Sequence, residues 1–312
     1  MTTYNIHYWQ PYLERLGLTR NDIPQDWQGF WQFWQDVRDQ LHQLGEEEIA
    51  NLCISLNKES SEARAIFMQF LHSHNVRIFD EQGEFVLNAP DNRQGLIDTL
   101  SQLSRLYRDG YIPPGAMTWS NADNNIQFLD RQCLLVINGS LSIPLTQQQP
   151  DSPYTQKVRN RYFDEIVTLP SWPRTVKGTP VEILVGLPRF IIPVNAKQQA
   201  IAKEFLTYLL QPENLQRFVE ERKGRMLPPM PELLNTPFWQ NYSDPHLAAV
   251  QSLSKGKTSP YPDPRHPAYV EISQEMIFGT ALESVIRNDV SPAVAADDAI
   301  ARIEEIIAQY DP

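Results

Sequence analysis

Apolar side chains recur at helical spacing along most of the longer segments of this chain, with short apolar runs between them. In residues 22–45 these positions are three or four apart, Asp22 or Asp26 can cap the start, and Gly45 follows the end. The apolar positions are Trp27, Phe30, Trp31, Trp34, Val37 and Leu41. Aromatic residues on one helical face are more often core than a stacking surface, so we expect this helix to pack inward.

The rest of the chain repeats this alternation of helix and strand. Further helices are predicted at 60–75, 91–109, 196–211, 212–224, 269–288 and 291–310. Strands are predicted at 133–139 and 165–170, a hairpin at 76–90 and an apolar segment at 183–194. Long helices with short strands between them predict an α/β fold that is rich in helix.

Composition narrows the function classes. The formal net charge of -11 argues against nucleic acid, whose phosphates are bound by Lys and Arg. Cys53 and Cys133 lie in apolar surroundings and are too few for a disulfide framework, so we expect a buried, reduced pair. The first 18 residues lack the basic and apolar regions of a signal peptide, and no apolar run approaches the roughly 20 residues of a membrane helix.

Motifs for enzyme chemistry are scarce. Gly256-Lys257-Thr258 resembles the end of a phosphate-binding loop, but the earlier glycine position is Gln251. His72 and His74 face different sides of a helix, and the Asn121, Asp123 and Asn125 positions lack the glycine and glutamate of a calcium loop. We therefore expect no metal, no cofactor and no catalytic residue. A pair of carboxylates for glycoside hydrolysis stays open, because their pairing is spatial.

Several segments, in a fixed order, resemble the motifs of one known family. IHYWQPYLERLGL and IPQDWQGFWQF resemble its first two motifs, and FVLNAPDNRQGLIDTLSQLSRLYRDGYIPPG resembles its strand, N-x-P and helix. IQFLDRQCLLVINGSLSIP is similar to F-x-x-G-x-x-A-M-x-x-x-G-x-W. The last two matches are IIPVNAKQQAIAKEFLTYLLQPENLQRFVEERKGRMLPPM and SPAVAADDAIARI. The family that these segments resemble is the extracellular solute-binding protein family 1, the maltose-binding-protein-like sugar binders of ABC importers.

The resemblance implies a type II periplasmic-binding-protein fold of two α/β lobes that close on a solute. It places most of the second lobe in 1–185, a first-lobe fragment in 186–228, and a return segment with C-terminal helices in 229–312. It also implies that the opening part of the first lobe is missing from this chain, so a truncated remnant that binds little is one alternative.

The resemblance also proposes ligand-contacting residues. Carried over by position, they are Tyr8, Asn138, Gly139, Ser140, Leu141, Gly186, Leu187, Arg189 and Arg225. Trp119 is added because flat aromatic faces and planar polar groups suit a sugar. Two departures bear on the site: Asp130-Arg131-Gln132 replaces a glycine turn, and Leu141 replaces a stacking tryptophan.

The function that the resemblance implies is non-enzymatic. A monomeric binding protein would capture a sugar or similar polar solute and deliver it to the membrane permease subunits of an ABC importer. It would be periplasmic or anchored outside the cytoplasmic membrane. The alternatives are a carbohydrate-active hydrolase and a non-binding remnant.

Overall fold

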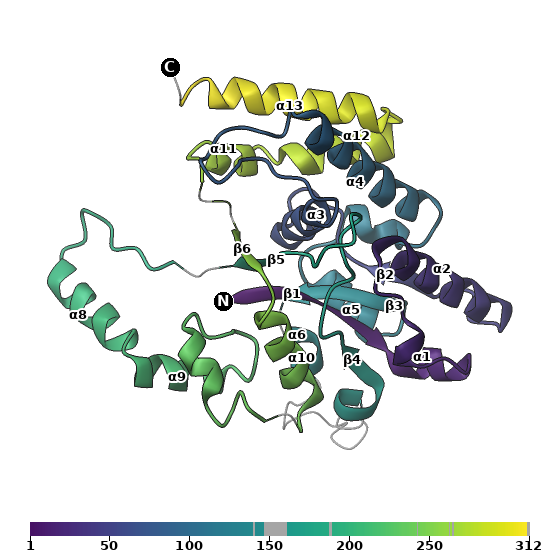
Figure 1. Cartoon of the computed structure of the whole chain (residues 1–312), viewed down its shortest axis with the longest axis horizontal. Helices are drawn as coiled ribbons and strands as arrows, with labels where there is room; N and C mark the ends of the chain where they lie inside the picture. Colours follow the sequence, from purple (N-terminus) through teal and green to yellow (C-terminus); the bar gives the residue numbers. More distant parts are fainter. Residues whose placement is uncertain are drawn as a thin grey trace.

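The computed structural model describes residues 1–139, 141–146, 161–186, 189–241, 243–261, 263 and 265–310. A mixed sheet with the strand order β2-β3-β1-β5-β6 runs through the molecule, and β4 also pairs with β1 (Figure 1). The strands are β1 (Thr2–Trp9), β2 (Ala50–Cys53), β3 (Cys133–Gly139), β4 (Ile166–Thr168), β5 (Ile183–Gly186) and β6 (Thr258–Tyr261). The predicted α/β class is confirmed.

Strand β1 runs antiparallel to β3, β4 and β5, whereas β2 is parallel to β3 and β6 is parallel to β5. The register places Tyr4 opposite Gly139 and Thr2 opposite Gly186. The carboxyl ends of β3, β5 and β6 and the start of β1 therefore meet at one edge of the sheet.

The α-helices cover the sheet and extend from it. They are α1 (Gln10–Arg15), α2 (Trp27–Gln43), α3 (Ser61–Ser73), α4 (Pro90–Arg108), α5 (Asp123–Leu129), α6 (Ser142–Leu145), α8 (Gln199–Leu209), α9 (Pro212–Glu221), α10 (Pro245–Ser254), α11 (Tyr269–Gln274), α12 (Ile277–Asn288) and α13 (Pro292–Ile307). Short 3-10 turns lie at 20–22, 114–117 and 231–235, and a π-helical turn at 161–165. Helices α3, α4, α12 and α13 pack together on one side, while α8 and α9 lie apart from the sheet (Figure 1).

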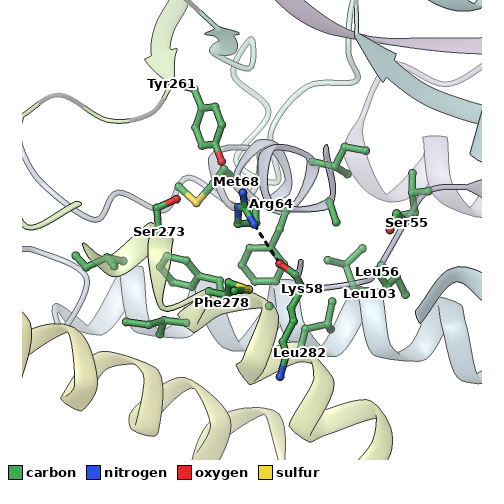
Figure 2. A pocket seen from close by; sticks show the side chains of 18 of the residues that line it. Ser55, Leu56, Lys58, Arg64, Met68, Leu103, Tyr261, Ser273, Phe278 and Leu282 are labelled. Carbon is green, nitrogen blue, oxygen red and sulfur yellow. Dashed lines mark hydrogen bonds between the residues drawn. The ribbon is translucent and has the colours of Figure 1, made fainter. Parts of the chain in front are cut away.

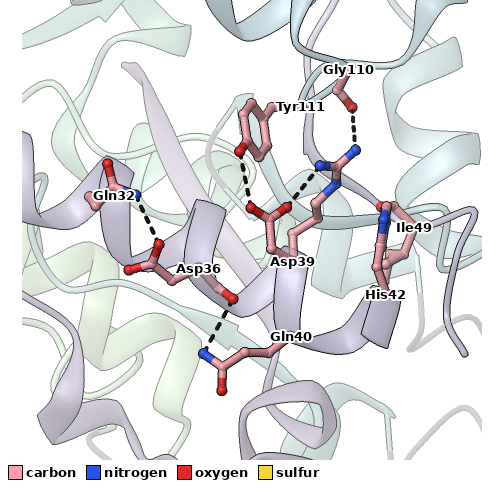
Figure 3. Close-up of polar contacts among 9 residues, drawn as sticks. Gln32, Asp36, Asp39, Gln40, His42, Ile49, Gly110 and Tyr111 are labelled. Atoms are coloured by element: carbon pink, nitrogen blue, oxygen red, sulfur yellow. Dashed lines mark hydrogen bonds and ion pairs between the residues drawn. The ribbon is translucent and has the colours of Figure 1, made fainter. Parts of the chain in front are cut away.

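The helix starts follow the sequence signals. Asp26 accepts a hydrogen bond from Gly29 N at 2.7 Å, and Ser60 Oγ accepts one from Ala63 N at 3.1 Å, so each side chain caps an otherwise unpaired donor. Near the end of α2, Arg38 bonds Asp39 and the carbonyl of Gly110, and Tyr111 donates to Asp39 at 3.2 Å (Figure 3). These contacts fix α2 against the loop that follows α4.

Two predictions about local structure were wrong. The expected hairpin at 76–90 is reduced to one isolated bridge, between Phe79 and Phe85, so the loop has no strands. The helix expected over 269–288 breaks into α11 and α12 because Met276 adopts a left-handed conformation with φ 54°. A non-glycine residue in that region interrupts the helical hydrogen bonds.

The expectation of reduced cysteines was also wrong. Cys53 and Cys133 form a disulfide with a Cα–Cα distance of 5.7 Å, and both are fully buried. Cys53 belongs to β2 and Cys133 to β3, which is the strand next to it in the sheet. A separation of 80 residues hid this proximity from the sequence.

The apolar face of α8 is uncovered. Ile201, Phe205 and Tyr208 share one stripe of the helix and are 61%, 59% and 60% exposed, and upstream Ile191 and Val194 are 85% and 93% exposed. Its neighbour α9 does bury Leu215 and Val219, which pack with Leu233. The helical pattern at 196–211 was therefore read correctly, but its apolar side does not face a core.

Removal of the disulfide should destabilise the fold. The bond closes a loop of 80 residues, for which the chain-entropy model gives up to about 4 kcal/mol. We expect Cys53→Ala/Cys133→Ala to lower the free energy of unfolding in urea by roughly that amount. A reductant should lower the free energy of unfolding of the wild type by a similar amount and leave that of the double variant unchanged. A wild type whose stability does not change with the reductant would contradict the presence of the disulfide.

Truncation of two phenylalanines should lower the free energy of unfolding by very different amounts. Phe128 is fully buried against Trp9 at a ring distance of 5.0 Å, so Phe128→Ala should cost about 3–5 kcal/mol. Phe205→Ala removes an exposed ring and should change the free energy of unfolding by less than about 0.5 kcal/mol. Comparable losses in urea titrations of the two variants would mean that the α8 face is covered.

Candidate functional site

The strongest candidate site is the sheet edge where β3, β5 and β6 end and β1 begins, which we call the strand-end site. In open α/β sheets ligands bind outside the carboxyl ends of parallel strands, where the loops and helix N-termini present polar groups. Helix α3 follows β2 and starts at this edge, and the start of α5 is hydrogen-bonded to the start of α3. At the start of α3 the N–H groups of Glu62 and Ala63 already donate to Asn121 and Ser60, so the polar groups that a ligand meets there are mainly side chains.

Asn121 joins the two helix starts. Its Oδ1 accepts from Ser60 Oγ at 2.6 Å and from Glu62 N at 3.4 Å, and its Nδ2 donates to Ser61 Oγ at 3.0 Å. Asn121 and Ser61 are exposed, so a ligand can reach them. Hydroxyl and amide groups of this kind donate and accept hydrogen bonds, which suits a neutral polar ligand.

A buried carboxyl lies beneath this surface. Glu62 is 8% exposed, and burial raises its pKa to about 7, although a hydrogen bond with Asn124 acts in the opposite direction. Its Oε2 has no hydrogen-bond partner. Burial, followed by the charge of Glu62, raises the pKa of Tyr4. The Glu62 carboxyl thus changes its protonation near neutral pH.

The site continues toward Tyr261, which ends β6 opposite Gly186. Burial raises the pKa of the Tyr261 phenol, and a hydrogen bond from Arg64 lowers it in part. Arg64 also donates to the carbonyls of Lys58 and Glu59, both at 3.3 Å. A guanidinium and two phenols thus line this end of the site.

An apolar pocket adjoins Arg64 and Tyr261, between α3, α11 and α12 (Figure 2). It encloses about 40 Å³, and Phe67 and Phe278 stack in its wall at a ring distance of 5.6 Å. One water occupies about 30 Å³ of liquid, so this volume is too small for a sugar ring. The pocket can extend the strand-end site for a small apolar group but cannot hold a sugar itself.

The predicted residues at the end of β3 lie at this edge. Asn138 is buried, donates to Asn125 and accepts from Ser142. Gly139 lies beside Thr2, where an added Cβ would come within 3.3 Å of its methyl group. Leu141 is fully buried in a separate cluster with Trp239 and Leu247, so it forms core rather than exposed floor. Ser140 lies outside the described residues.

The predicted residues of the crossing segment are divided. Gly186 ends β5 beside Thr2 and Tyr261, within the strand-end site. Arg189 and Arg225 are both exposed on the segments that lead to and from α8 and α9. Leu187 lies outside the described residues.

The two predicted aromatic contacts have different surroundings. Tyr8 is fully buried, 5.2 Å from the Trp34 ring, and its hydroxyl bonds Gln10 at 3.5 Å. It lies at the opposite end of β1 from the strand-end site. Trp119 is half-buried two residues before Asn121, and its carbonyl accepts from Ser55 at 3.0 Å. Direct ligand contact by any predicted residue stays a prediction.

Sequence reasoning missed the side chains that occupy the centre of the site: Tyr4, Glu62, Arg64, Asn121, Asn124 and Tyr261. The sequence pointed to Asn121 only as part of an incomplete calcium loop, whereas in the structure its side chain accepts from Glu62 N at the start of α3. The available signal was the placement of Ser60 and Ser61 at a helix start shortly after a buried strand.

Within the part of the chain that the structure describes, no group of three His, Cys, Asp or Glu side chains is placed to hold a metal ion. Among the described helices, none is both long and apolar enough to span a membrane.

Known structures share this fold. The sugar-binding protein MalE of Xanthomonas citri aligns with a TM-score of 0.70 at 17% identity, over 99% of this chain and 70% of that chain. Maltose-bound MalE3 of T. maritima aligns with a TM-score of 0.72 at 15% identity, over 98% and 71%. A solute-binding protein of Agrobacterium radiobacter K84 in complex with ribitol aligns with a TM-score of 0.65 at 19% identity, over 98% of this chain and 70% of that chain.

No curated protein sequence matches the chain. A family model, that of bacterial extracellular solute-binding proteins, matches residues 1–249, which is most of its length. This chain therefore belongs to the bacterial extracellular solute-binding protein family.

Proposed function

We propose that this chain is the solute-binding component of an ABC importer, and that it holds a sugar or similar polar solute at the strand-end site for delivery to the membrane permease. The observation that carries the proposal is that three strand ends lie at one edge of the sheet, together with two helix starts that the exposed Asn121 and Ser61 join. Family membership and the sugars named with the solved relatives support it.

The chemistry of the site favours a neutral polyhydroxylated ligand. Asn121 and the serine hydroxyls can donate and accept, which matches sugar hydroxyls, and Tyr4 and Tyr261 supply aromatic surface. Arg64 adds a strong donor. Binding alone accounts for this arrangement, and we propose that the chain performs no catalysis.

The disulfide supports a position outside the cytoplasmic membrane. Disulfides form and persist in oxidising compartments such as the periplasm and are rare in the cytosol. The Cys53–Cys133 bond is buried between β2, at one edge of the sheet, and its neighbour β3, where it contributes to the fold. We therefore propose that the chain acts as a monomer in that compartment, where it contacts the permease subunits.

Substitution of Asn121 should weaken solute binding without unfolding the chain. We expect a panel of maltose, laminaribiose, tagatose and ribitol to include a ligand measurable by calorimetry. Asn121→Ala should weaken the binding of that ligand at least about tenfold, because it removes several hydrogen bonds at the site. Asn21→Ala, on a distant exposed turn, should bind normally.

Other outcomes would count against the proposal. Equal affinity of the Asn121 and Asn21 variants would move the site elsewhere, and no binding by any sugar would remove the sugar assignment. Release of product from aryl glycosides by the wild-type chain would favour the hydrolase alternative.

The Glu62 carboxyl should make stability depend on pH. Its pKa is raised to about 7 from 4.5, so the unfolded chain ionises first and stability falls as the pH rises from about 4.5 through 7. This shift corresponds to about 3 kcal/mol. We expect Glu62→Gln to flatten that fall in urea unfolding measured from pH 5 to pH 8. An unchanged profile would mean that Glu62 is ionised in the folded chain.

A further inference from the structure

A second polar pocket lies at the opposite edge of the β5–β6 pair, where these strands begin. It encloses about 570 Å³, within the range of small-molecule sites. Its walls come from the loop after α3, the loop before β5 and the turn before β6. The lining residues that carry the argument are His72, Arg77, Thr179, Glu182 and Lys257. Since the strand-end site lies beyond the other end of both strands, this pocket is a separate place on the molecule.

Two cations share a single carboxylate in this pocket. Arg77 Nη2 lies 3.2 Å from Glu182 Oε1, and Lys257 Nζ pairs with that same oxygen. The Glu182 side chain is 15% exposed, whereas Arg77 and Lys257 are 40% and 71% exposed. Both cations are therefore accessible from the pocket while the carboxylate is largely enclosed.

The protonation states leave an excess of positive charge. Burial opposes ionisation of Glu182, but the hydrogen bond and charge of Lys257 and the charge of Arg77 outweigh it and lower the pKa of this carboxyl. Burial lowers the pKa of His72 to about 4, so its ring is neutral at pH 7. Two cations then face one anion, on a chain whose total charge is -11.

The remaining groups suit an oxyanion. Arg77 uses one terminal nitrogen for Glu182, so its planar fork can present other N–H groups to a ligand. The ammonium of Lys257 has two further N–H donors, and the hydroxyls of Thr175 and Thr179 hydrogen-bond each other at 2.8 Å beside it. These donors converge where the local charge is positive.

We propose that this pocket binds a small oxyanion, a phosphate or a carboxylate, through Arg77 and Lys257. The ligand neutralises the positive charge that Glu182 leaves uncompensated. Glu182 lowers the affinity for the ligand because it competes for both cations. The site acts independently of the solute held at the strand-end site, so it can be occupied whether or not the chain binds a sugar.

The test uses inorganic phosphate, glycerol 3-phosphate and succinate at pH 7.5, with sodium chloride added to hold ionic strength constant. Calorimetry and the unfolding midpoint should both report binding to wild type. Lys257→Gln and Arg77→Gln should each weaken it about tenfold, whereas Glu182→Gln should strengthen it about tenfold. The phosphate and succinate arms decide which oxyanion is preferred.

Lys177→Gln is the matched control, since Lys177 is an exposed cation that pairs with Asp91 at 3.3 Å and does not line the pocket. It carries the same change in charge and should bind like wild type. If Lys177→Gln and Lys257→Gln weaken oxyanion binding equally, the effect comes from the overall charge of the chain and not from this pocket. If Glu182→Gln leaves the affinity unaltered, Glu182 does not compete with the ligand for the two cations. Either result, or no binding to wild type, would overturn the proposal.

Discussion

Strand β1 organises the molecule because it is paired along both of its edges. β3 lies along one side, and β5 and β4 pair with opposite ends of the other. Its direction is opposite to that of β3 and β5, so its first residues lie beside the ends of those strands. The pairing that closes the core therefore also assembles the strand-end site. A slip of one residue in register would turn the buried Ile6 and Tyr8 to the other face and separate Thr2 from Gly186.

The site retains polar groups that a core optimised for stability would not contain. Glu62, Asn5 and Asn124 each have a buried atom without a hydrogen-bond partner near the helix starts and the first residues of β1. Such atoms cost about 1–3 kcal/mol each. Atoms of the same kind occur away from this edge, in Trp34, Asn75 and Trp239, so they are a cost that the fold bears at several places.

Local sequence signals predicted the features that depend on neighbouring residues. They failed for the features that depend on contacts between distant segments. Asp26 and Ser60 cap helices as their sequence context indicates, and the apolar run 133–139 forms β3. The disulfide depends on β2 lying next to β3, and Tyr8 of β1 is covered by Trp34 of α2. Tyr4 and Tyr261 meet through strand order. Spacing along the chain carries none of this information, which is why the centre of the candidate site was missed.

Strands β5 and β6 separate two kinds of chemistry. Each strand has four residues, and at about 3.3 Å per step its first and last residues lie roughly 10 Å apart. The pKa of Glu62 is shifted by its own burial and by a hydrogen bond with Asn124, whereas Arg77 and Lys257 pair with Glu182 at the other edge. One edge can hold a neutral solute over a buried carboxyl while the other holds an anion, and occupation of either does not require the other.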